Sequence, residues 1–310
     1  MSGTLNVLCC QLDIAWEDKP ANFARVGAML DSAAVGEGDL VVLPEMFATG
    51  FSMDAAALAE GPGGPTERFL AELARRRRCW VVAGLAAQAR STAVPAVCTT
   101  GVSSVDLPGN DNAHGQDGGG THGQALGAPY GEARATAAAA PLPRATNDAV
   151  ALNPAGQLVG RYSKMHLFSP AQEHLHYQAG REVCLLDLGP FRSSLLICYD
   201  LRFPELARQA VRQGAELLVF LANWPLVREA HWLALLRARA IENQAFVIGV
   251  NRCGASPHDA YGGRSLVIDP RGGVLAEAGA GPQVLRAALD AQALREYRDT
   301  FPALKDIRLP

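Results

Sequence analysis

Short, almost wholly apolar runs alternate along this chain with longer segments that have the pattern of helices. Residues 39–43, 80–85 and 216–222 are such runs, and they are typical of strands that are buried on both faces of a sheet. Residues 20–35 and 65–78 precede the first two runs, and the earlier segment has Ala, Leu and Val at helical spacing. Helices that alternate with buried strands in this way predict an α/β fold.

The rest of the chain mixes such crossovers with antiparallel hairpins. Turn sequences at residues 153–156 and 269–272 each join two strand-like segments, which predicts two hairpins. Pro204 and Glu205 begin a predicted helix that Gly214 closes. Further strands are expected at residues 6–13, 149–152, 157–162, 191–197, 245–250, 263–268, 273–276 and 283–289, and helices at 205–213 and 228–243.

One long stretch departs from this pattern. Residues from about 89 to 143 are rich in Gly, Ala, Ser, Thr and Pro and poor in large apolar side chains. Such a composition cannot bury enough surface to offset the entropy lost on ordering. It predicts a low-complexity surface insertion within a single domain that spans residues 1–310.

The composition excludes several classes of protein. The 310 residues are 49% hydrophobic and 19% charged, with a formal net charge of −3, so no basic surface favours nucleic acid. No apolar run is long enough to cross a bilayer, and the N-terminal residues lack the pattern of a signal peptide. The seven cysteines are scattered, without a Cys-x-x-Cys pair, which argues against a zinc site and a disulfide framework. A cytoplasmic protein with no nucleic-acid or membrane partner is therefore expected.

Three ionisable side chains follow three of the predicted strands. Glu45, Lys164 and Cys198 each stand just after one of them, and strand ends on one side of an α/β sheet are where active sites usually form. A thiol between a buried strand and a helix is held rigidly and can still be reached, as a nucleophile requires. Taken singly, each residue has a plainer interpretation: a carboxylate in a solvated turn, a lysine at a sheet edge and an inert core cysteine.

The segments around these residues resemble the signature segments of the nitrilase superfamily and occur in that family's order. They are residues 43–47 (LPEMF), 161–168 (RYSKMHLF) and 198–205 (CYDLRFPE). The resemblance implies a four-layer αββα sandwich, a Glu-Lys-Cys triad and hydrolysis of a non-peptide carbon–nitrogen bond without a metal or an organic cofactor. It implies that Glu45 is the general base, Lys164 the cation on the oxyanion side and Cys198 the nucleophile. Many members carry a second glutamate near the lysine, for which Glu173 is the candidate.

The chemistry of amide hydrolysis accounts for these residue types. A thiolate attacks an amide carbon better than a thiol does, so a neighbouring base and cation are expected to favour its formation. Glu45 would accept the thiol proton, donate it to the departing nitrogen and then activate water against the thioester. Lys164 and the backbone N–H of Tyr199 could stabilise the negative oxygen of the tetrahedral intermediates. Glu173 could hold Lys164 in place or hydrogen-bond the substrate.

Four further segments resemble the bacterial omega-amidase branch, which is similar to enzymes that deamidate 2-oxoglutaramate and 2-oxosuccinamate. They are residues 173–180, 222–225, 231–244 and 297–303. An anionic substrate needs a cation in the pocket, and Arg202 is the candidate because a guanidinium binds a carboxylate bidentately. The alternative for Arg202 is a structural ion pair with Asp200 or Glu205.

Four other side chains are candidates for the pocket wall. Asn223 and Trp224 directly follow a predicted strand, although a tryptophan there could simply pack in the core. Phe47 and Phe51 could form an apolar wall beside the candidate base, or they could be ordinary core residues.

Other functions are compatible with the same sequence. A nitrilase-type hydrolase could act on another small amide, a carbamoyl amine or a nitrile, and a common fold can carry a catalytically silent binding protein. Acyl transfer to an amine is a third alternative, but the membrane-bound acyltransferases of the superfamily need transmembrane helices.

His166, His174 and His176 lie close in sequence, but no acidic and cysteine set completes a zinc site, so no metal is expected. The family commonly forms homodimers or larger homo-oligomers, which is the expected assembly.

Overall fold

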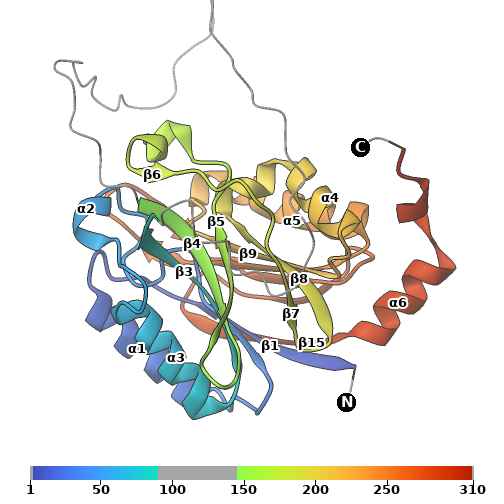
Figure 1. Ribbon diagram of the computed structural model, residues 1–310, viewed down its shortest axis with the longest axis horizontal. Coiled ribbons are helices and arrows are strands. Elements are labelled where there is room, and N and C mark those ends of the chain that lie inside the picture. The colour runs from blue at the N-terminus through green and yellow to red at the C-terminus, as the bar shows by residue number, and fades with distance from the viewer. Residues whose placement is uncertain (1–2, 90–144, 309–310) are drawn as a thin grey trace, which may run out of the picture.

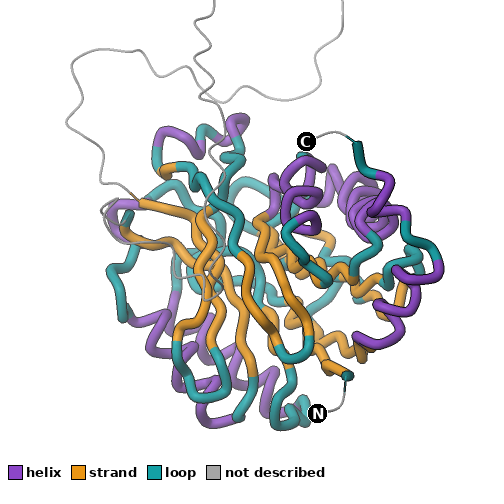
Figure 2. Tube along the Cα trace, turned by 45° about the vertical axis from the view of Figure 1, so that its right-hand side comes forward, coloured by secondary structure: helices purple, strands orange, loops and turns teal. Residues whose placement is uncertain are grey.

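The computed structural model describes residues 3–89 and 145–308. These residues form two β-sheets that pack face to face between two layers of helices (Figure 1 and Figure 2). The predicted four-layer αββα sandwich is therefore confirmed. The predicted insertion lies outside the described residues, apart from Ala89.

The first sheet has seven strands and joins the two ends of the chain. Its order is β15-β1-β2-β3-β4-β5, with β6 paired to β4. The central strands β1, β2 and β3 are parallel, and β15 is antiparallel to β1. The strands are β1 (Thr4–Gln11), β2 (Leu40–Val42), β3 (Trp80–Gln88), β4 (Ala145–Leu152), β5 (Leu158–Ser163), β6 (Tyr177–Gln178) and β15 (Gln283–Asp290).

The second sheet has six strands in the order β14-β13-β10-β9-β8-β7. Its central strands β8, β9 and β10 are parallel. The strands are β7 (Leu185–Leu188), β8 (Phe191–Ile197), β9 (Leu217–Ala222), β10 (Phe246–Asn251), β13 (Leu266–Ile268) and β14 (Val274–Glu277). A separate hairpin pairs β11 (Cys253–Ala255) with β12 (Ala260–Gly262).

Helices cover the outer face of each sheet. The first sheet is covered by α1 (Lys19–Ser32) and α3 (Pro65–Arg77), and the second by α4 (Pro204–Arg212) and α5 (Glu229–Asn243) (Figure 1). The other α-helices are α2 (Ala55–Leu58) and α6 (Ala291–Thr300), and the 3₁₀ helices are η1 (Ser169–Ala171), η2 (Glu173–Leu175), η3 (Cys198–Arg202), η4 (Leu226–Arg228) and η5 (Ala303–Asp306). None of the described helices has the length and apolar character that a membrane span needs.

Successive side chains of β1 point alternately into two different hydrophobic cores. Val7 and Cys9 belong to the core that includes the second sheet, whereas Leu8 and Cys10 pack in the core that includes α1 and α3. All four side chains are fully buried. A strand with apolar neighbours on both faces has no polar alternation, which is why the sequence reads as continuous apolar runs.

Most of the predicted elements are present, with ends displaced by a few residues. Helix α1 ends at Ser32, three residues before the expected end at 35, and β4 begins at Ala145, before the expected start at 149. The sequence prediction missed β7, the β11–β12 hairpin and α6. Helix α6 buries only Ala291 and Leu294, so its apolar periodicity is too weak to separate it from a loop.

Candidate active site

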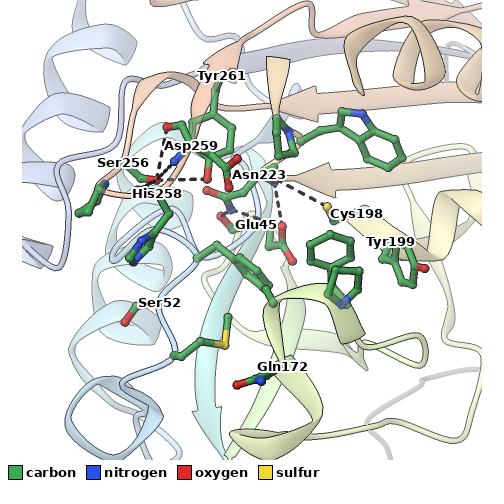
Figure 3. Close-up of a pocket in the computed structure, with 18 of the residues that line it drawn as sticks. Glu45, Ser52, Gln172, Cys198, Tyr199, Asn223, Ser256, His258, Asp259 and Tyr261 are labelled. Atoms are coloured by element: carbon green, nitrogen blue, oxygen red, sulfur yellow. Dashed lines mark hydrogen bonds between the residues drawn. The ribbon is translucent and has the colours of Figure 1, made fainter. Parts of the chain in front are cut away.

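Glu45, Lys164 and Cys198 line one cavity of about 570 Å³. Glu45 lies just beyond β2 and Lys164 follows β5, both in the first sheet, whereas Cys198 follows β8 in the second. Figure 3 shows the side chains of Glu45 and Cys198 near each other, each joined to Asn223 by a hydrogen bond. The structure therefore brings together the three strand-end residues that the sequence singles out.

Lys164 is fully buried between two carboxylates. Its Nζ donates to Glu45 Oε1 at 3.1 Å and to Glu173 Oε1 and Oε2 at 3.2 and 2.9 Å. Burial opposes the positive charge, but the carboxylates of Glu173 and Glu45 outweigh that effect and raise the pKa of Lys164. The side chain is therefore a permanent cation in the wall of the cavity.

Asn147 belongs to this network and is absent from the residues that the sequence singles out. Its Nδ2 donates to Glu45 Oε1 at 2.8 Å and to Glu173 Oε1 at 2.9 Å, so one amide bridges the two carboxylates. Its backbone carbonyl also accepts a hydrogen bond from the Lys164 N–H at 2.8 Å. Asn147 lies on β4, ahead of the expected start of that strand, so no strand pattern could show that it points inward.

Asn223 and Gly84 determine where Glu45 lies. The backbone N–H of Asn223 donates to Glu45 Oε2 at 2.8 Å, and its Nδ2 donates to the Glu45 carbonyl at 2.6 Å. On the β3 side, a Cβ at Gly84 would lie 2.5 Å from Glu45 Cα, so this close approach of two backbones requires glycine. Asn223 therefore lines the cavity, as expected, and also orients the carboxylate.

Cys198 stands at a sharp turn between β8 and η3. Its φ is +44°, a left-handed conformation that is uncommon for a residue other than glycine and is often found at functional sites. Its Sγ lies 3.9 Å from the Asn223 carbonyl oxygen. Burial raises the pKa of the Cys198 thiol well above its ordinary value of 9.0, and Glu45 raises it further than Lys164 lowers it. These effects favour the neutral thiol over the thiolate, so the expected transfer of the thiol proton to Glu45 is needed before attack.

Asp200 joins the strand that ends at the cysteine to the loop that carries the lysine. Its Oδ1 accepts from the His166 backbone N–H at 3.0 Å and lies 2.9 Å from His166 Nδ1. Its Oδ2 accepts from Tyr162 Oη at 2.7 Å and from the Ile197 N–H at 3.0 Å. The carboxylate is buried, so these four contacts link the two catalytic candidates through one side chain.

Arg202 lines the cavity, and neither of its alternative ion pairs forms among the described residues. Its guanidinium carbon lies 4.8 Å from the Trp224 ring centroid, and its Nη2 lies 3.2 Å from His231 Nδ1. Trp224 also packs against Trp232, with ring centroids 5.5 Å apart. Trp224 therefore belongs both to the cavity wall and to the core.

Phe47 does not reach the cavity. It is fully buried and packs against Phe23 and Phe69, at ring-centroid distances of 6.1 and 6.2 Å, in the core beneath α1 and α3. Phe51 lines the cavity instead, with its ring centroid 5.1 Å from Lys164 Nζ. The structure therefore places Phe51, and not Phe47, in the wall, because the turn after the glutamate points the earlier ring outward to the helices.

Tyr199 is the second residue of η3 and also lines the cavity. The first N–H groups of a helix have no partner within it, so this backbone can offer donors beside the thiol. The Tyr199 ring contacts Phe168 and Phe203 edge-on, at centroid distances of 5.1 and 5.3 Å. These contacts fix the ring at the cavity wall.

Part of the wall comes from segments to which the sequence prediction assigned no element. Ser256, His258, Asp259 and Tyr261, from the β11–β12 hairpin, lie together on one side of the cavity (Figure 3). Buried Arg252 anchors this hairpin: its Nη2 donates to the Ala255 carbonyl at 2.8 Å, and its guanidinium carbon lies 4.4 Å from the Tyr261 ring centroid. The hairpin stands outside both large sheets, so the strand pattern of the sequence does not reveal it.

The three clustered histidines have separate environments. His176 lines the cavity, His166 contacts Asp200, and His174 is exposed beside the buried Glu173. Within residues 3–89 and 145–308, no group of three or more His, Cys, Asp or Glu side chains is arranged to hold a metal ion.

Comparison with known proteins shows the family to which this site belongs. The carbon–nitrogen hydrolase family model matches residues 6–112 and 120–299. A 2-oxoglutaramate amidase from Bacillus subtilis is 32% identical over 303 residues, which cover 97% of each chain. The omega-amidase YafV of Escherichia coli K12 is 33% identical over 304 residues, covering 97% of this chain and 96% of the relative.

Solved structures show the same relationship. A CN-hydrolase superfamily protein from Xanthomonas campestris, with an arsenic adduct in its active site, is 31% identical with a TM-score of 0.76, and 99% of this chain and 98% of that chain align. Nit3 of Saccharomyces cerevisiae, a member of the nitrilase superfamily, is 26% identical with a TM-score of 0.73, and 96% and 94% of the two chains align.

Proposed function

This chain belongs to the carbon–nitrogen hydrolase family, and we propose that it is an omega-amidase that uses Cys198 to release ammonia from the omega-amide of a small 2-oxo acid. As a family member it is a hydrolase of carbon–nitrogen bonds, and its relatives support an amidase. The observation that carries the proposed mechanism is the buried Lys164, which lies between Glu45 and Glu173 in the cavity that holds the Cys198 thiol. The substrate class is taken from the activities for which these relatives are named.

In the first step Cys198 acts as the nucleophile and Glu45 as the base. The Cys198 Sγ forms a bond to the amide carbon, the thiol proton moves to the Glu45 carboxylate, and the carbonyl π electrons move to oxygen. The raised pKa of the thiol makes this base necessary, because little thiolate exists at neutral pH. Asn223 orients the Glu45 carboxylate for the transfer.

Lys164 and the Tyr199 N–H stabilise the oxyanion of the tetrahedral intermediate. Each such donor typically contributes about 3 kcal/mol to the transition state. As the intermediate collapses, the carbon–nitrogen bond breaks and protonated Glu45 gives its proton to the leaving nitrogen, which departs as ammonia. The acyl group remains on Cys198 as a thioester.

Hydrolysis of the thioester repeats the same proton movements. Glu45, again a carboxylate, takes a proton from water while the water oxygen attacks the thioester carbon. The second oxyanion uses the same donors, the carbon–sulfur bond breaks, and the proton returns to the sulfur. The free carboxylic acid leaves and the thiol is restored.

Glu173 and Asn147 act as positioning residues in this scheme. Glu173 accepts both from Lys164 and from the Phe168 backbone N–H at 2.6 Å, and Asn147 bridges Glu173 to Glu45. These contacts hold the cation and the base at a fixed separation while protons move.

The ionisation of Cys198 offers a prediction about pH. Because burial and Glu45 raise the pKa of the thiol above 9.0, the side chain stays protonated at neutral pH, and thiolate appears only as the pH rises beyond that value. The ultraviolet absorbance of thiolate, taken as the difference between the protein and its Cys198→Ala variant, measures this directly. A thiolate signal already present at neutral pH would contradict the proton-transfer scheme.

The proposed substrate class is tested by a panel assayed for ammonia or acid production. We expect 2-oxoglutaramate and 2-oxosuccinamate to have the highest kcat/KM, because Arg202 offers a guanidinium to the carboxylate of these keto-amides. A neutral aliphatic amide, a carbamoyl amine and a nitrile complete the panel. A preference for any of these three would contradict the proposed keto-amide substrate but would leave the assignment as a carbon–nitrogen hydrolase unchanged.

The setting of the activity is also part of the proposal. We propose a single domain of residues 1–310 with the insertion at about 89–143, acting in the cytoplasm as a homodimer or larger homo-oligomer. Its partner is the small-molecule amide, without nucleic acid or membrane, and the proposed steps use no cofactor.

A further inference from the structure

The cavity contains three cations, and only one of them is engaged by carboxylates. Lys164 contacts Glu45 and Glu173. Arg202 and Arg228 also line the cavity, and neither forms an ion pair within the described part of the chain. Two guanidinium groups in one cavity without a carboxylate partner are unusual, because a partly buried charge is normally paired.

The main chain of Arg228 is fixed where η4 meets α5. Its carbonyl accepts from Trp224 Nε1 at 2.7 Å, and its N–H donates to the Pro225 carbonyl at 3.0 Å. Trp224 is fixed in turn by Asn251, whose Oδ1 accepts from the Trp224 N–H at 2.7 Å. The Arg228 side chain therefore extends from a part of the cavity wall whose backbone is held in place by hydrogen bonds.

The side chain of Arg228 is supported by an aromatic ring. Its guanidinium carbon lies 5.4 Å from the ring centroid of Phe168, within the range of a cation–π contact. Such a contact orients the guanidinium and leaves its N–H groups free to bind a planar anion. Arg228 is only half-buried, so a ligand in the cavity can reach it.

Arg202 and Arg228 meet at the same tryptophan. The Arg202 guanidinium lies over the Trp224 ring, and the edge of that ring donates to the Arg228 backbone. Asp259 carries a negative charge that interacts with Arg228. Burial raises the pKa of Asp259, and the positive charge of Arg228 lowers it. No ion pair joins these two among the described residues, so the interaction between Arg228 and this carboxylate acts at a distance and leaves the guanidinium without a direct carboxylate partner.

We propose that Arg228 is a second carboxylate-binding residue, which with Arg202 selects omega-amides that carry a free carboxylate at the end opposite the amide. This inference rests on the proposed function for its substrate. The two guanidinium groups beside Trp224 would select the charge of the substrate, and the residues around Lys164 would carry out the hydrolysis.

A matched pair of substrates separates charge selection from catalysis. Glutaramate and its neutral methyl ester have the same amide, and they differ in charge at the far end. In Arg228→Gln we expect the ratio of kcat/KM for glutaramate to kcat/KM for the ester to fall at least about tenfold, mainly through KM, because a hydrogen bond to a charged group is lost. Arg228→Lys keeps the charge but loses bidentate geometry, so a smaller fall of about threefold is expected.

Arg237→Gln provides the control, because Arg237 is exposed on α5 and does not line the cavity. Binding of glutaramate to a Cys198→Ala background, measured by calorimetry, tests the inference without turnover. There, Arg228→Gln should weaken binding at least about tenfold and Arg237→Gln should not.

An unchanged substrate ratio in both Arg228 variants, or equal losses on the two substrates, would overturn the role of Arg228. If the wild-type chain hydrolyses neither substrate, the proposed function is what fails, and the calorimetric comparison still decides the binding role. Glutaramate affinity that does not differ between the Arg228→Gln and Arg237→Gln backgrounds rejects it there as well.

Discussion

Replacing Cys198 with alanine is expected to lower kcat/KM for amide hydrolysis by on the order of 10⁴-fold or more, which is the scale of losing a catalytic nucleophile. The thiol stands at the end of β8 in the cavity shared by Glu45 and Lys164. Without it the base and the cation remain, but no covalent bond to the acyl carbon can form. Ammonia release from 2-oxoglutaramate measures the loss.

Cys79→Ala is the matched control for this substitution. Cys79 is fully buried directly before β3 and lies outside the cavity, so its replacement tests the general cost of shortening a core cysteine. We expect that variant to keep activity within a few-fold of wild type if it folds. Turnover by Cys198→Ala comparable to that of Cys79→Ala would remove the nucleophile from the mechanism.

Glu45→Gln is expected to lower kcat by about 10³-fold, within the usual range for loss of a general base. Glutamine keeps the size of the side chain and can still accept a hydrogen bond from Lys164, but it cannot take the thiol proton. Removal of the negative charge should also lower the pKa of Cys198, because Glu45 contributes to raising it. The variant should therefore carry more thiolate than wild type at a given pH while reacting far more slowly.

The control for the base is Glu60→Gln. Glu60 is another buried carboxylate, paired with Lys19 at 2.5 Å and outside the cavity. Its replacement should affect stability and leave kcat near wild type. If Glu45→Gln and Glu60→Gln lose activity to the same extent, the Glu45 effect is structural and another group supplies the base.

The fold was predictable because its information is local and repeated. Residues 39–43, 80–85 and 216–222 each carry a run of apolar side chains, and the layers that bury them follow from strand and helix alternation. The elements that the sequence prediction missed lack such a signal: helix α6 buries two side chains, and the β11–β12 hairpin stands outside both large sheets, with an isolated bridge from Cys253 to Asp13.

The candidate site was predictable where chemistry coincides with a strand end. Glu45, Lys164 and Cys198 stand out because each is a charged or reactive residue that directly follows a predicted strand. Asn147 sits inside a strand, and Arg228 sits on a 3₁₀ turn, so neither position carries a pattern. Their placement depends on contacts between segments far apart in the chain.

Two further features of the site depend on the direction in which a side chain points and on its surroundings, and neither can be read from a linear sequence. Phe47 and Phe51 are four residues apart, yet the turn between them sends the first into the core and the second into the cavity. The neighbours of Cys198 include a cation, as expected, but burial and Glu45 each raise the pKa of the thiol more than Lys164 lowers it. The sum of burial and several charges decides the protonation state.

The proposed thioester is tested most directly by mass measurement of the protein quenched in acid during turnover of 2-oxoglutaramate. We predict an adduct with the mass of the substrate less ammonia, located on the peptide that contains Cys198 and missing from Cys198→Ala. An adduct on a different residue, or undiminished turnover by Cys198→Ala, would contradict covalent catalysis at Cys198.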